Sequence, residues 1–259
     1  GGQIGRAARR ERGGERIGIG DWRVAECERL GVAIRYSQYA EAADIRAANP
    51  DIVVIATGGL PNTDILDAGA EHVVTTWDIL SGDVAPGENV LLFDDNGAYP
   101  GMQAGEFIAR AGARLEIVTP ERGLAAEIGG MNHVPFAEAF QECGSRITIN
   151  SRLRRVERNG NQLTAHLSSE FTENMAESRD VDQVVVEHGT LPLDQIYFEL
   201  KPASVNLGAV DYDALLAGEP QTIAANAQGD FQLFRIGDAV ASRNIHAAIY
   251  DALRLCKDF

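Results

Sequence analysis

The sequence predicts an α/β fold built on parallel strands, and three observations support this. Two apolar runs, Asp51–Ala56 and Asp182–Glu187, have the near-continuous pattern of strands that are covered on both faces. A third run, Val90–Phe93, leads into a helix and a further strand. The last stretch, Phe231–Phe259, again has the order strand, turn and helix. Strands that alternate with helices in this way form parallel sheets.

The C-terminal stretch predicts a phosphate-binding turn. Phe231–Ile236 is typical of a buried strand, Gly237-Asp238 ends it, and the polar link Ser242–Asn244 leads into a helical pattern. Free N–H groups at a helix start attract an anion, and an aspartate can accept hydrogen bonds from sugar hydroxyls. The predicted cofactor-binding residues of this stretch are Gly237, Asp238, Arg243, Asn244, Ile245 and His246. A generic βα unit without a ligand is the alternative.

Two of these residues have a second interpretation. Arg243 can pair with a phosphate or form a surface salt bridge worth ~0–1 kcal/mol. His246 can contact a phosphate, or it can cap or pack the helix start. No nucleophile–base pair, carboxylate dyad or metal-ligand spacing stands out in the sequence. We therefore predict no catalytic and no metal-binding residues.

The same stretch carries a family resemblance. The segment RIGDAVASRNIHAAIYDALR resembles the Gly-Asp motif that closes the FAD-binding domain of flavoproteins with two dinucleotide-binding domains. It is similar to a branch that joins an old-yellow-enzyme-like FMN barrel to a C-terminal flavoprotein module. That branch includes trimethylamine dehydrogenase, histamine dehydrogenase, N-methylproline demethylases and 2,4-dienoyl-CoA reductase. The resemblance spans the chain and is strongest at Asp51–Gly59, Val90–Pro120 and Phe231–Asp258.

The resemblance implies two Rossmann-like dinucleotide-binding domains, the FAD/NAD(P)-binding flavoprotein fold. We place a FAD/ADP-binding-like domain at residues 1–85 and 228–259, and an NAD(P)-binding-like domain at residues 86–227. The boundary falls in the loop-like segment Ser81–Asn89. The first domain is discontinuous, and the sequence from Gly1 onward does not supply the expected initial βαβ unit with its GxGxxG loop. We expect the chain to begin inside that domain and to bind FAD weakly by itself.

Two further groups of site residues follow from the resemblance. Gly1, Gly2 and Gln3 correspond to a turn after the second strand of the FAD domain, where paired glycines let the backbone approach a ligand. An artificial N-terminal extension is the alternative for Gly1 and Gly2. Thr57 and Gly58 correspond to a strand end at the crossover between the domains, where glycine allows close approach to the flavin nucleotide. A strand followed by a plain turn is the alternative there.

The second domain is expected to be degenerate. Val90–Pro120 has Rossmann form, but its loop Asp94–Gly101 has aspartates where a dinucleotide loop needs glycines. Two carboxylates at this place would repel a pyrophosphate, so we expect no NAD(P)H binding. Asp94 and Asp95 are interpreted as solvated strand-end residues, because two further metal ligands are missing nearby.

The resemblance implies that the chain is the C-terminal part of a flavin-dependent oxidoreductase. This module would hold FAD or ADP, while FMN, a [4Fe–4S] cluster and the substrate site would lie in an N-terminal barrel portion of the same enzyme. Amine dehydrogenation or N-demethylation is the favoured activity, with electrons passing to an electron-transfer flavoprotein. The alternatives are an NAD(P)H-dependent enoate or 2,4-dienoyl-CoA reductase and a non-catalytic ADP-binding structural module.

The composition limits which binding partners and which cellular compartment are expected. The formal charge of −15 on 259 residues disfavours nucleic acid and anionic membranes as partners. No run approaches the ~20 apolar residues that cross a bilayer. The three cysteines lie far apart without a CxxC motif, which argues against a redox disulfide and against an iron–sulfur or zinc site within this chain, and favours the reducing cytoplasm. We also expect a homo-oligomer.

Local patterns predict the remaining segments. They are a loop at Gly13–Gly20, a helix from the N-cap Asp21 to Leu30 that is closed by Gly31, a strand at Val32–Tyr36, a hairpin at Asn159-Gly160 and an exposed turn at Phe171–Asp180.

Overall fold

The computed structural model describes residues 2–8, 14, 17–172 and 174–258. The chain forms two compact units. The first contains Gly1–Ala33 and Pro61–Gly189, and the second contains Ile34–Leu60 and Thr190–Phe259. Both units are discontinuous in sequence.

These units divide the chain at other positions than the boundaries predicted near residues 85 and 227. Residues 61–85 join the first unit because β3 (Val73–Thr75) pairs with β10 (Gln183–Glu187). Residues 190–227 join the second unit because the buried Leu200 of α7 (Gln195–Leu200) packs into that unit's core. Pairing and packing partners that are distant in sequence therefore set the unit boundaries.

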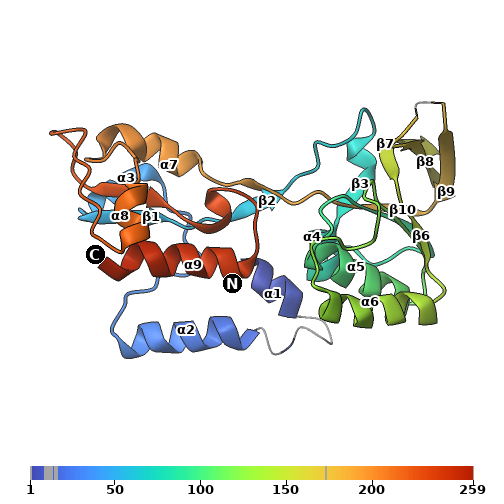
Figure 1. The fold of residues 1–259 in the computed structure, drawn as a ribbon, viewed down its shortest axis with the longest axis horizontal. Helices are drawn as coiled ribbons and strands as arrows, with labels where there is room; N and C mark the ends of the chain where they lie inside the picture. The colour runs from blue at the N-terminus through green and yellow to red at the C-terminus, as the bar shows by residue number, and fades with distance from the viewer. Residues whose placement is uncertain (1, 9–13, 15–16, 173, 259) are drawn as a thin grey trace. The chain divides into compact units, whose positions relative to one another are not determined.

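A five-stranded parallel sheet forms the centre of the first unit (Figure 1). Its strand order is β3-β10-β4-β5-β6, and each neighbouring pair is parallel. The strands not yet introduced are β4 (Asn89–Asp94), β5 (Arg114–Val118) and β6 (Arg146–Thr148). Together with the parallel pair of the second unit described below, this sheet confirms the predicted α/β class.

The sheet of the first unit is covered on both faces. Three helices cover one face: α4 (Thr76–Ser81), α5 (Tyr99–Arg110) and α6 (Gly130–Glu142). An antiparallel sheet covers the other: β7 (Ser151–Asn159), β8 (Gln162–Ser169) and β9 (Ala176–Val181). Side chains alternate along β4, so Val90 and Leu92 pack with the helices while Leu91 and Phe93 pack with the antiparallel sheet.

The antiparallel sheet confirms one local prediction and corrects another. β7 and β8 form the hairpin predicted at Asn159-Gly160, with Asn159 opposite Gln162. The exposed turn predicted at Phe171–Asp180 is wrong for its second half, which belongs to β9. This polar segment becomes a strand because its backbone pairs with β8 from Ala176 to Val181.

The N-terminal part of the first unit is helical. It contains α1 (Gly2–Ala8) and α2 (Ile17–Arg29). The predicted N-cap at Asp21 and part of the predicted loop are wrong, because α2 begins four residues earlier and tolerates its two glycines at a propensity cost of about 1 kcal/mol each. Gly31 follows the helix in the left-handed conformation, as predicted for a closing glycine. Residues 32–36 have no regular secondary structure, so the predicted strand is wrong: among the described residues, no strand pairs with them.

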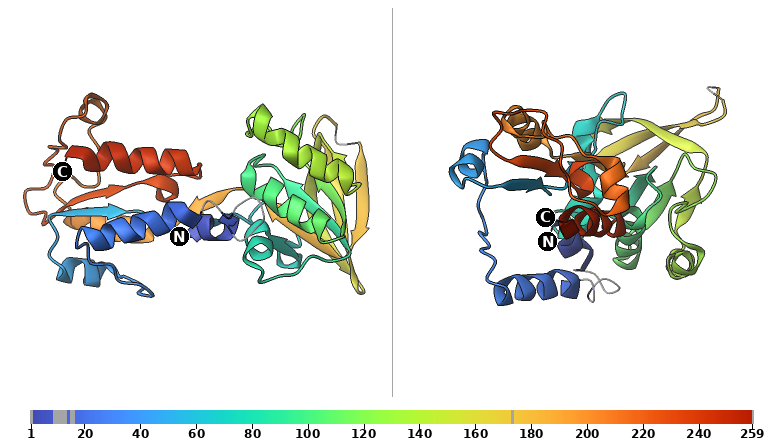
Figure 2. Two further views of the ribbon diagram at one scale, coloured as in Figure 1. Left: turned by 90° about the horizontal axis from the view of Figure 1, so that it is seen from below. Right: turned by 60° about the vertical axis from the view of Figure 1, so that its left-hand side comes forward.

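The second unit is built on two parallel strands, β1 (Ile52–Ile55) and β12 (Gln232–Arg235). Helices α3 (Ala42–Ala47) and α7 lie on one side of this pair and α9 (Ile245–Leu255) lies on the other, as Figures 1 and 2 show. The buried core contains Val53, Ile55, Tyr197, Leu200, Phe231, Leu233 and Ala239.

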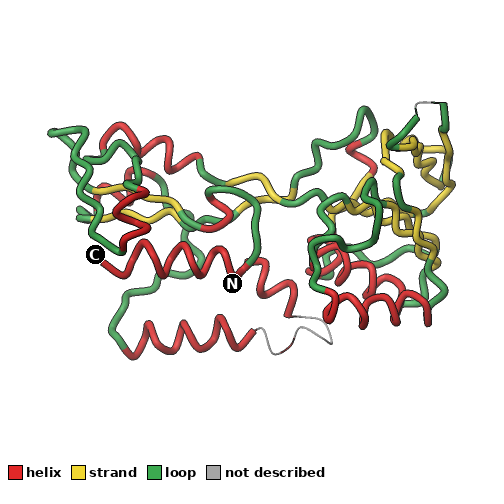
Figure 3. The backbone as a smooth tube through the Cα atoms, viewed as in Figure 1, coloured by secondary structure: helices red, strands yellow, loops and turns green. Residues whose placement is uncertain are grey.

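Short elements complete the chain, as the colouring in Figure 3 shows. They are β2 (Gly59–Pro61), which pairs with β11 (Thr190–Pro192), helix α8 (Tyr212–Ala217), and the 3-10 turns η2 (Ala70–His72), η3 (Lys201–Ala203), η4 (Gly237–Ala239) and η5 (Cys256–Asp258). Within the described ranges, no helix combines the length and apolarity needed to cross a bilayer.

Candidate functional site

In the second unit, a loop follows the carboxyl end of each of the two parallel strands. Residues 56–58 follow β1, and η4 follows β12. The strands are in register, with Ile55 opposite Arg235, and the N–H of Ile236 donates to the carbonyl oxygen of Ile55 at 2.9 Å. The two loops therefore start side by side. In open α/β sheets, ligands bind outside this edge.

Gly237 is required by the geometry of the second loop. Its φ is +63°, in the left-handed region, and its Cα faces α9. A Cβ at this position would lie 3.3 Å from the Cβ of Ala248. The N–H of Gly237 donates to Oδ2 of Asp251 at 2.9 Å. The loop is thus held against the helix by close packing and by a hydrogen bond.

Arg243 is paired with a carboxylate of this chain. Its guanidinium donates to both carboxylate oxygens of Asp251, with 3.3 Å to Oδ1, and to the carbonyl oxygen of Gly237 at 3.3 Å. The side chain of Arg243 is 36% exposed and that of Asp251 is 24% exposed. The pairing matches the salt-bridge interpretation of Arg243. It also neutralises the positive charge of the guanidinium that a phosphate would otherwise bind.

Asp238 and Asn244 shape the link between the turn and the helix. Oδ1 of Asp238 accepts a hydrogen bond from the N–H of Arg243 at 3.1 Å. Asn244 is the N-cap of α9, and its side chain accepts from the N–H of Ala247 at 3.0 Å. Among the described residues, no acceptor meets the backbone N–H groups of Ile245 and His246. The helix start therefore keeps donors that an anion can use.

The first loop contains a backbone position that is open to a ligand. The hydroxyl of Thr57 donates to the carbonyl oxygen of Leu193. The N–H of Leu193 in turn donates to the carbonyl oxygen of Gly58 at 3.0 Å. Gly58 has φ +76°, and no heavy atom lies within 4 Å of the place that a Cβ would take. Thr57 therefore anchors the loop, while Gly58 leaves space above the backbone.

The N-terminal residues of the predicted site differ from that prediction. Gly1 lies outside the described residues. Gly2 and Gln3 belong to α1 of the first unit, so they form a helix start where a turn was predicted. The other predicted site residues all belong to the second unit.

Sequence reasoning missed two residues that hold the site together. Asp251 lies seven residues after Asn244, two turns along the same side of α9, and this spacing was the available signal. Arg235, at the end of β12, pairs with Asp194 and donates to the carbonyl oxygen of Ala239 at 3.4 Å. Its guanidinium lies 4.7 Å from the centre of the Tyr197 ring. Arg235 thereby fixes η4 from the strand side.

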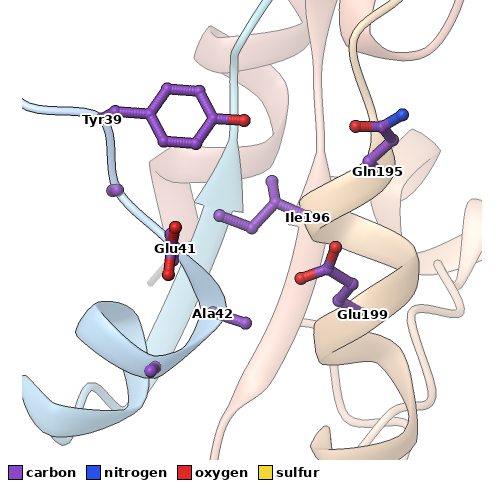
Figure 4. Close-up of a pocket in the computed structure, with 8 residues that line it drawn as sticks. Tyr39, Glu41, Ala42, Gln195, Ile196 and Glu199 are labelled. Carbon is purple, nitrogen blue, oxygen red and sulfur yellow. The ribbon is translucent and has the colours of Figure 1, made fainter.

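An open cavity of about 390 Å³ lies between α3 and α7 in the same unit (Figure 4). The carboxylates of Glu41 and Glu199 line it together with the ring of Tyr39. None of the predicted site residues lines it, and its acidic walls disfavour a phosphate. Within the described ranges, no three His, Cys, Asp or Glu side chains cluster as a metal site.

The first unit carries a cluster of buried acids at the carboxyl ends of β4 and β10. Oδ1 of Asp94 accepts from the N–H groups of Asn96 at 3.0 Å and Gly97 at 2.9 Å. Its Oδ2 is buried without a hydrogen-bond partner among the described residues. Burial raises the pKa of Asp94 to about 7, against the lowering effect of the hydrogen bond from Gly97. The predicted solvated strand end is therefore wrong for Asp94, which is 1% exposed, and for Asp95, whose side chain is 8% exposed.

The other two acids of this cluster are satisfied. Glu187 accepts from the Thr76 hydroxyl, from Nδ2 of Asn96 at 3.1 Å and from the N–H of Gly189 at 3.0 Å. Burial raises the pKa of Glu187 as well. Asp95 pairs with Nδ1 of His188 and with Arg152 at 3.5 Å.

Comparison with known proteins shows where this chain belongs. No protein-family model matches it. It is 54% identical over 258 residues to a probable N-methylproline demethylase of Rhizobium meliloti (strain 1021), covering 100% of this chain and 38% of the relative. It is 43% identical over 270 residues to N,N-dimethylglycine/sarcosine dehydrogenase of Chromohalobacter salexigens, covering 100% and 39%. A multifunctional alkene reductase/demethylase of Caballeronia cordobensis is 36% identical over 241 residues, covering 93% and 36%.

The chain is thus similar over 93–100% of its length to relatives named as a demethylase, a dehydrogenase and a reductase/demethylase. It spans a little over a third of the length of each of these relatives. Solved structures support the fold. A 2-naphthoyl-CoA reductase matches with a TM-score of 0.75 at 19% identity, over 98% of this chain and 34% of that one. Histamine dehydrogenase from Rhizobium sp. 4-9 matches with a TM-score of 0.69 at 19% identity, over 98% and 38%.

Proposed function

We propose that this chain is the C-terminal nucleotide-binding portion of a flavin-dependent oxidoreductase of the amine dehydrogenase or N-demethylase type. The observation that carries the proposal is the 54% identity to a probable N-methylproline demethylase over the whole chain. The 43% identity to a dimethylglycine/sarcosine dehydrogenase supports the same substrate class, a small N-methylated amine.

The second unit is proposed as the FAD/ADP-binding-like domain and the first unit as the NAD(P)-binding-like domain. Residues at the carboxyl ends of β1 and β12 fit a nucleotide. Gly58 leaves space for close approach, and the N–H groups of Ile245 and His246 can donate to a phosphate. Asp238, which accepts from the N–H of Arg243, is half-buried and can accept from a sugar hydroxyl. A bound flavin supplies the electron-transfer chemistry, while these residues bind and orient it.

The remaining parts of the proposal concern the complete enzyme. FMN, a [4Fe–4S] cluster and the amine site are assigned to an N-terminal barrel portion, which would be this chain's partner. Electrons would leave to an electron-transfer flavoprotein, and the enzyme would be a homo-oligomer.

Two measurements on the complete enzyme test this function. Denaturation should release FAD or ADP, which chromatography identifies. N-methylproline or N,N-dimethylglycine should bleach the flavin absorbance under anaerobic conditions, whereas NADPH should not. Release of ADP without any flavin in the enzyme would instead support the structural ADP-binding module.

An enoate reductase is the second candidate. The relative named as an alkene reductase/demethylase is 36% identical over 93% of this chain. The name of this one relative includes both activities. Flavin reduction by NADPH followed by reoxidation with an activated alkene, without any response to N-methyl amines, would establish this alternative.

A further inference from the structure

We propose that Asp94 closes the β4–α5 loop of the first unit to a dinucleotide, because its carboxylate takes the backbone donors that a pyrophosphate would need. The inference names a specificity-determining residue and goes beyond the proposed amine chemistry. It rests only on the part of that proposal that makes the first unit an NAD(P)-binding-like domain.

The first step concerns the N–H groups of the loop. In a Rossmann-type unit, the turn after the first strand offers bare N–H groups to the pyrophosphate. Here β4 ends at Asp94, and Oδ1 of that residue accepts from Asn96 at 3.0 Å and from Gly97 at 2.9 Å. The carboxylate therefore occupies these two donors from inside the chain.

The second step concerns the start of α5. A Cβ at Gly101 would lie 2.2 Å from Oδ2 of Asp94, so the carboxyl group fills the space between the strand end and the first turn of the helix. Pro100 lies in that same turn and has no N–H to offer. The glycine that would admit a phosphate instead admits the aspartate.

The third step concerns the outer side of the loop. The N–H of Glu127 donates to the carbonyl oxygen of Gly97 at 3.1 Å. A Cβ at Gly97 would lie 3.2 Å from the backbone nitrogen of Ala126. The chain itself thus covers the position where a ligand would approach Gly97.

The two neighbouring aspartates, Asp94 and Asp95, have different hydrogen-bond partners. Asp95 is paired with His188 and Arg152, and its carboxylate makes none of the contacts with the loop N–H groups. Simple repulsion by two carboxylates is therefore not the main obstacle. Occupation of the loop donors by Asp94 is the obstacle.

Three variants of the complete protein distinguish these causes. Asp94→Ala removes the acceptor, Asp94→Asn removes the charge but keeps an acceptor oxygen, and Asp95→Asn is the matched control. Inorganic pyrophosphate and NADH are titrated by calorimetry, and hydrogen–deuterium exchange is followed in peptides that cover residues 94–101. Neither readout depends on amine turnover, so a failure here is distinct from a failure of the proposed function.

We expect Asp94→Ala to bind pyrophosphate at least tenfold more tightly than the parent, with faster exchange at residues 96–97 that pyrophosphate slows again. The parent, Asp94→Asn and Asp95→Asn should lack this response. An equal gain in Asp94→Asn would make charge the cause and overturn the proposal. So would a folded Asp94→Ala that behaves like the parent. If Asp94→Ala does not fold, Asp94→Gly takes its place. NADH binding to the parent, with protection of residues 94–101, would overturn the proposal without any variant.

Discussion

Asp251, in the second half of α9, accepts a hydrogen bond from the backbone N–H of Gly237 at 2.9 Å. The same carboxylate pairs with the guanidinium of Arg243. One side chain thus joins the turn after β12, the polar link and the helix that follows. Since the donors that suit a phosphate lie at the start of this helix, Asp251 positions the candidate nucleotide site without belonging to it.

Asp251→Ala should destabilise the second unit and weaken nucleotide retention. The variant leaves the N–H of Gly237 without its acceptor, which costs about 1–3 kcal/mol; the partly exposed ion pair with Arg243 adds little. Asp251→Asn keeps an oxygen for this N–H and should lose less. Urea unfolding and the nucleotide retained after dialysis are measured, with Asp230→Ala as an exposed control. Unfolding curves that coincide for Asp251→Ala and the parent would contradict this role.

Gly237→Ala should be more harmful than the same change at Gly218, the glycine that closes α8. Both glycines have positive φ, +63° and +72°, so alanine costs about 1–2 kcal/mol at each position. Only Gly237 has a neighbour in the way, the Cβ of Ala248 at 3.3 Å, whereas nothing lies within 4 Å at Gly218. The urea midpoints of the two variants compare these effects. Equal midpoints would show that the helix yields to the new methyl group.

Asp238 can be tested by a pair of variants, because its Oδ1 already accepts from the N–H of Arg243. Asp238→Ala loses this bond and any bond to a sugar hydroxyl, so nucleotide retention should weaken by about 1.5–3 kcal/mol. Asp238→Asn keeps an acceptor for the Arg243 N–H and should weaken retention less. The nucleotide dissociation constant is measured in the complete enzyme. An unchanged constant in both variants, with the fold intact, removes Asp238 from the site.

The buried Asp94 predicts a loss of stability as pH rises. Its pKa is raised from 3.8 to about 7 by burial, so between these values the folded state holds a proton that the unfolded state has lost. The free energy of unfolding should fall by up to about 1.4 kcal/mol per pH unit over this range and level off above pH 7. The raised pKa of Glu187 acts in the same direction.

Asp94→Asn should flatten this dependence when unfolding is measured between pH 5 and 8. Glu177→Gln is the control, since a hydrogen bond from Arg179 lowers the pKa of Glu177 below this window. Curves for the parent and Asp94→Asn that run parallel across the window would show that Asp94 does not titrate there.

Much of the fold could be predicted because hydrophobic patterning is local. The run Asp51–Ala56 contains β1, and the run Asp182–Glu187 contains β10, since an unbroken apolar stretch needs cover on both faces. The helix after Asn244 and the closing glycine Gly31 are also visible in the sequence, because a cap acts on its own turn. The family resemblance likewise depends on residues that stand next to one another in the chain.

Other features were decided only by the tertiary structure, because they depend on residues that are distant in sequence. The polar segment Ala176–Val181 is a strand because β8 pairs with it, and the apolar segment Val32–Tyr36 is not a strand because no strand does so among the described residues. In the predicted C-terminal helix, the apolar side chain of Leu253 is 63% exposed. Two adjacent aspartates look alike in sequence, yet one fills the loop and the other faces His188. The charge of a side chain can be read from the sequence. The donors that bind this side chain depend on how the whole chain folds around it.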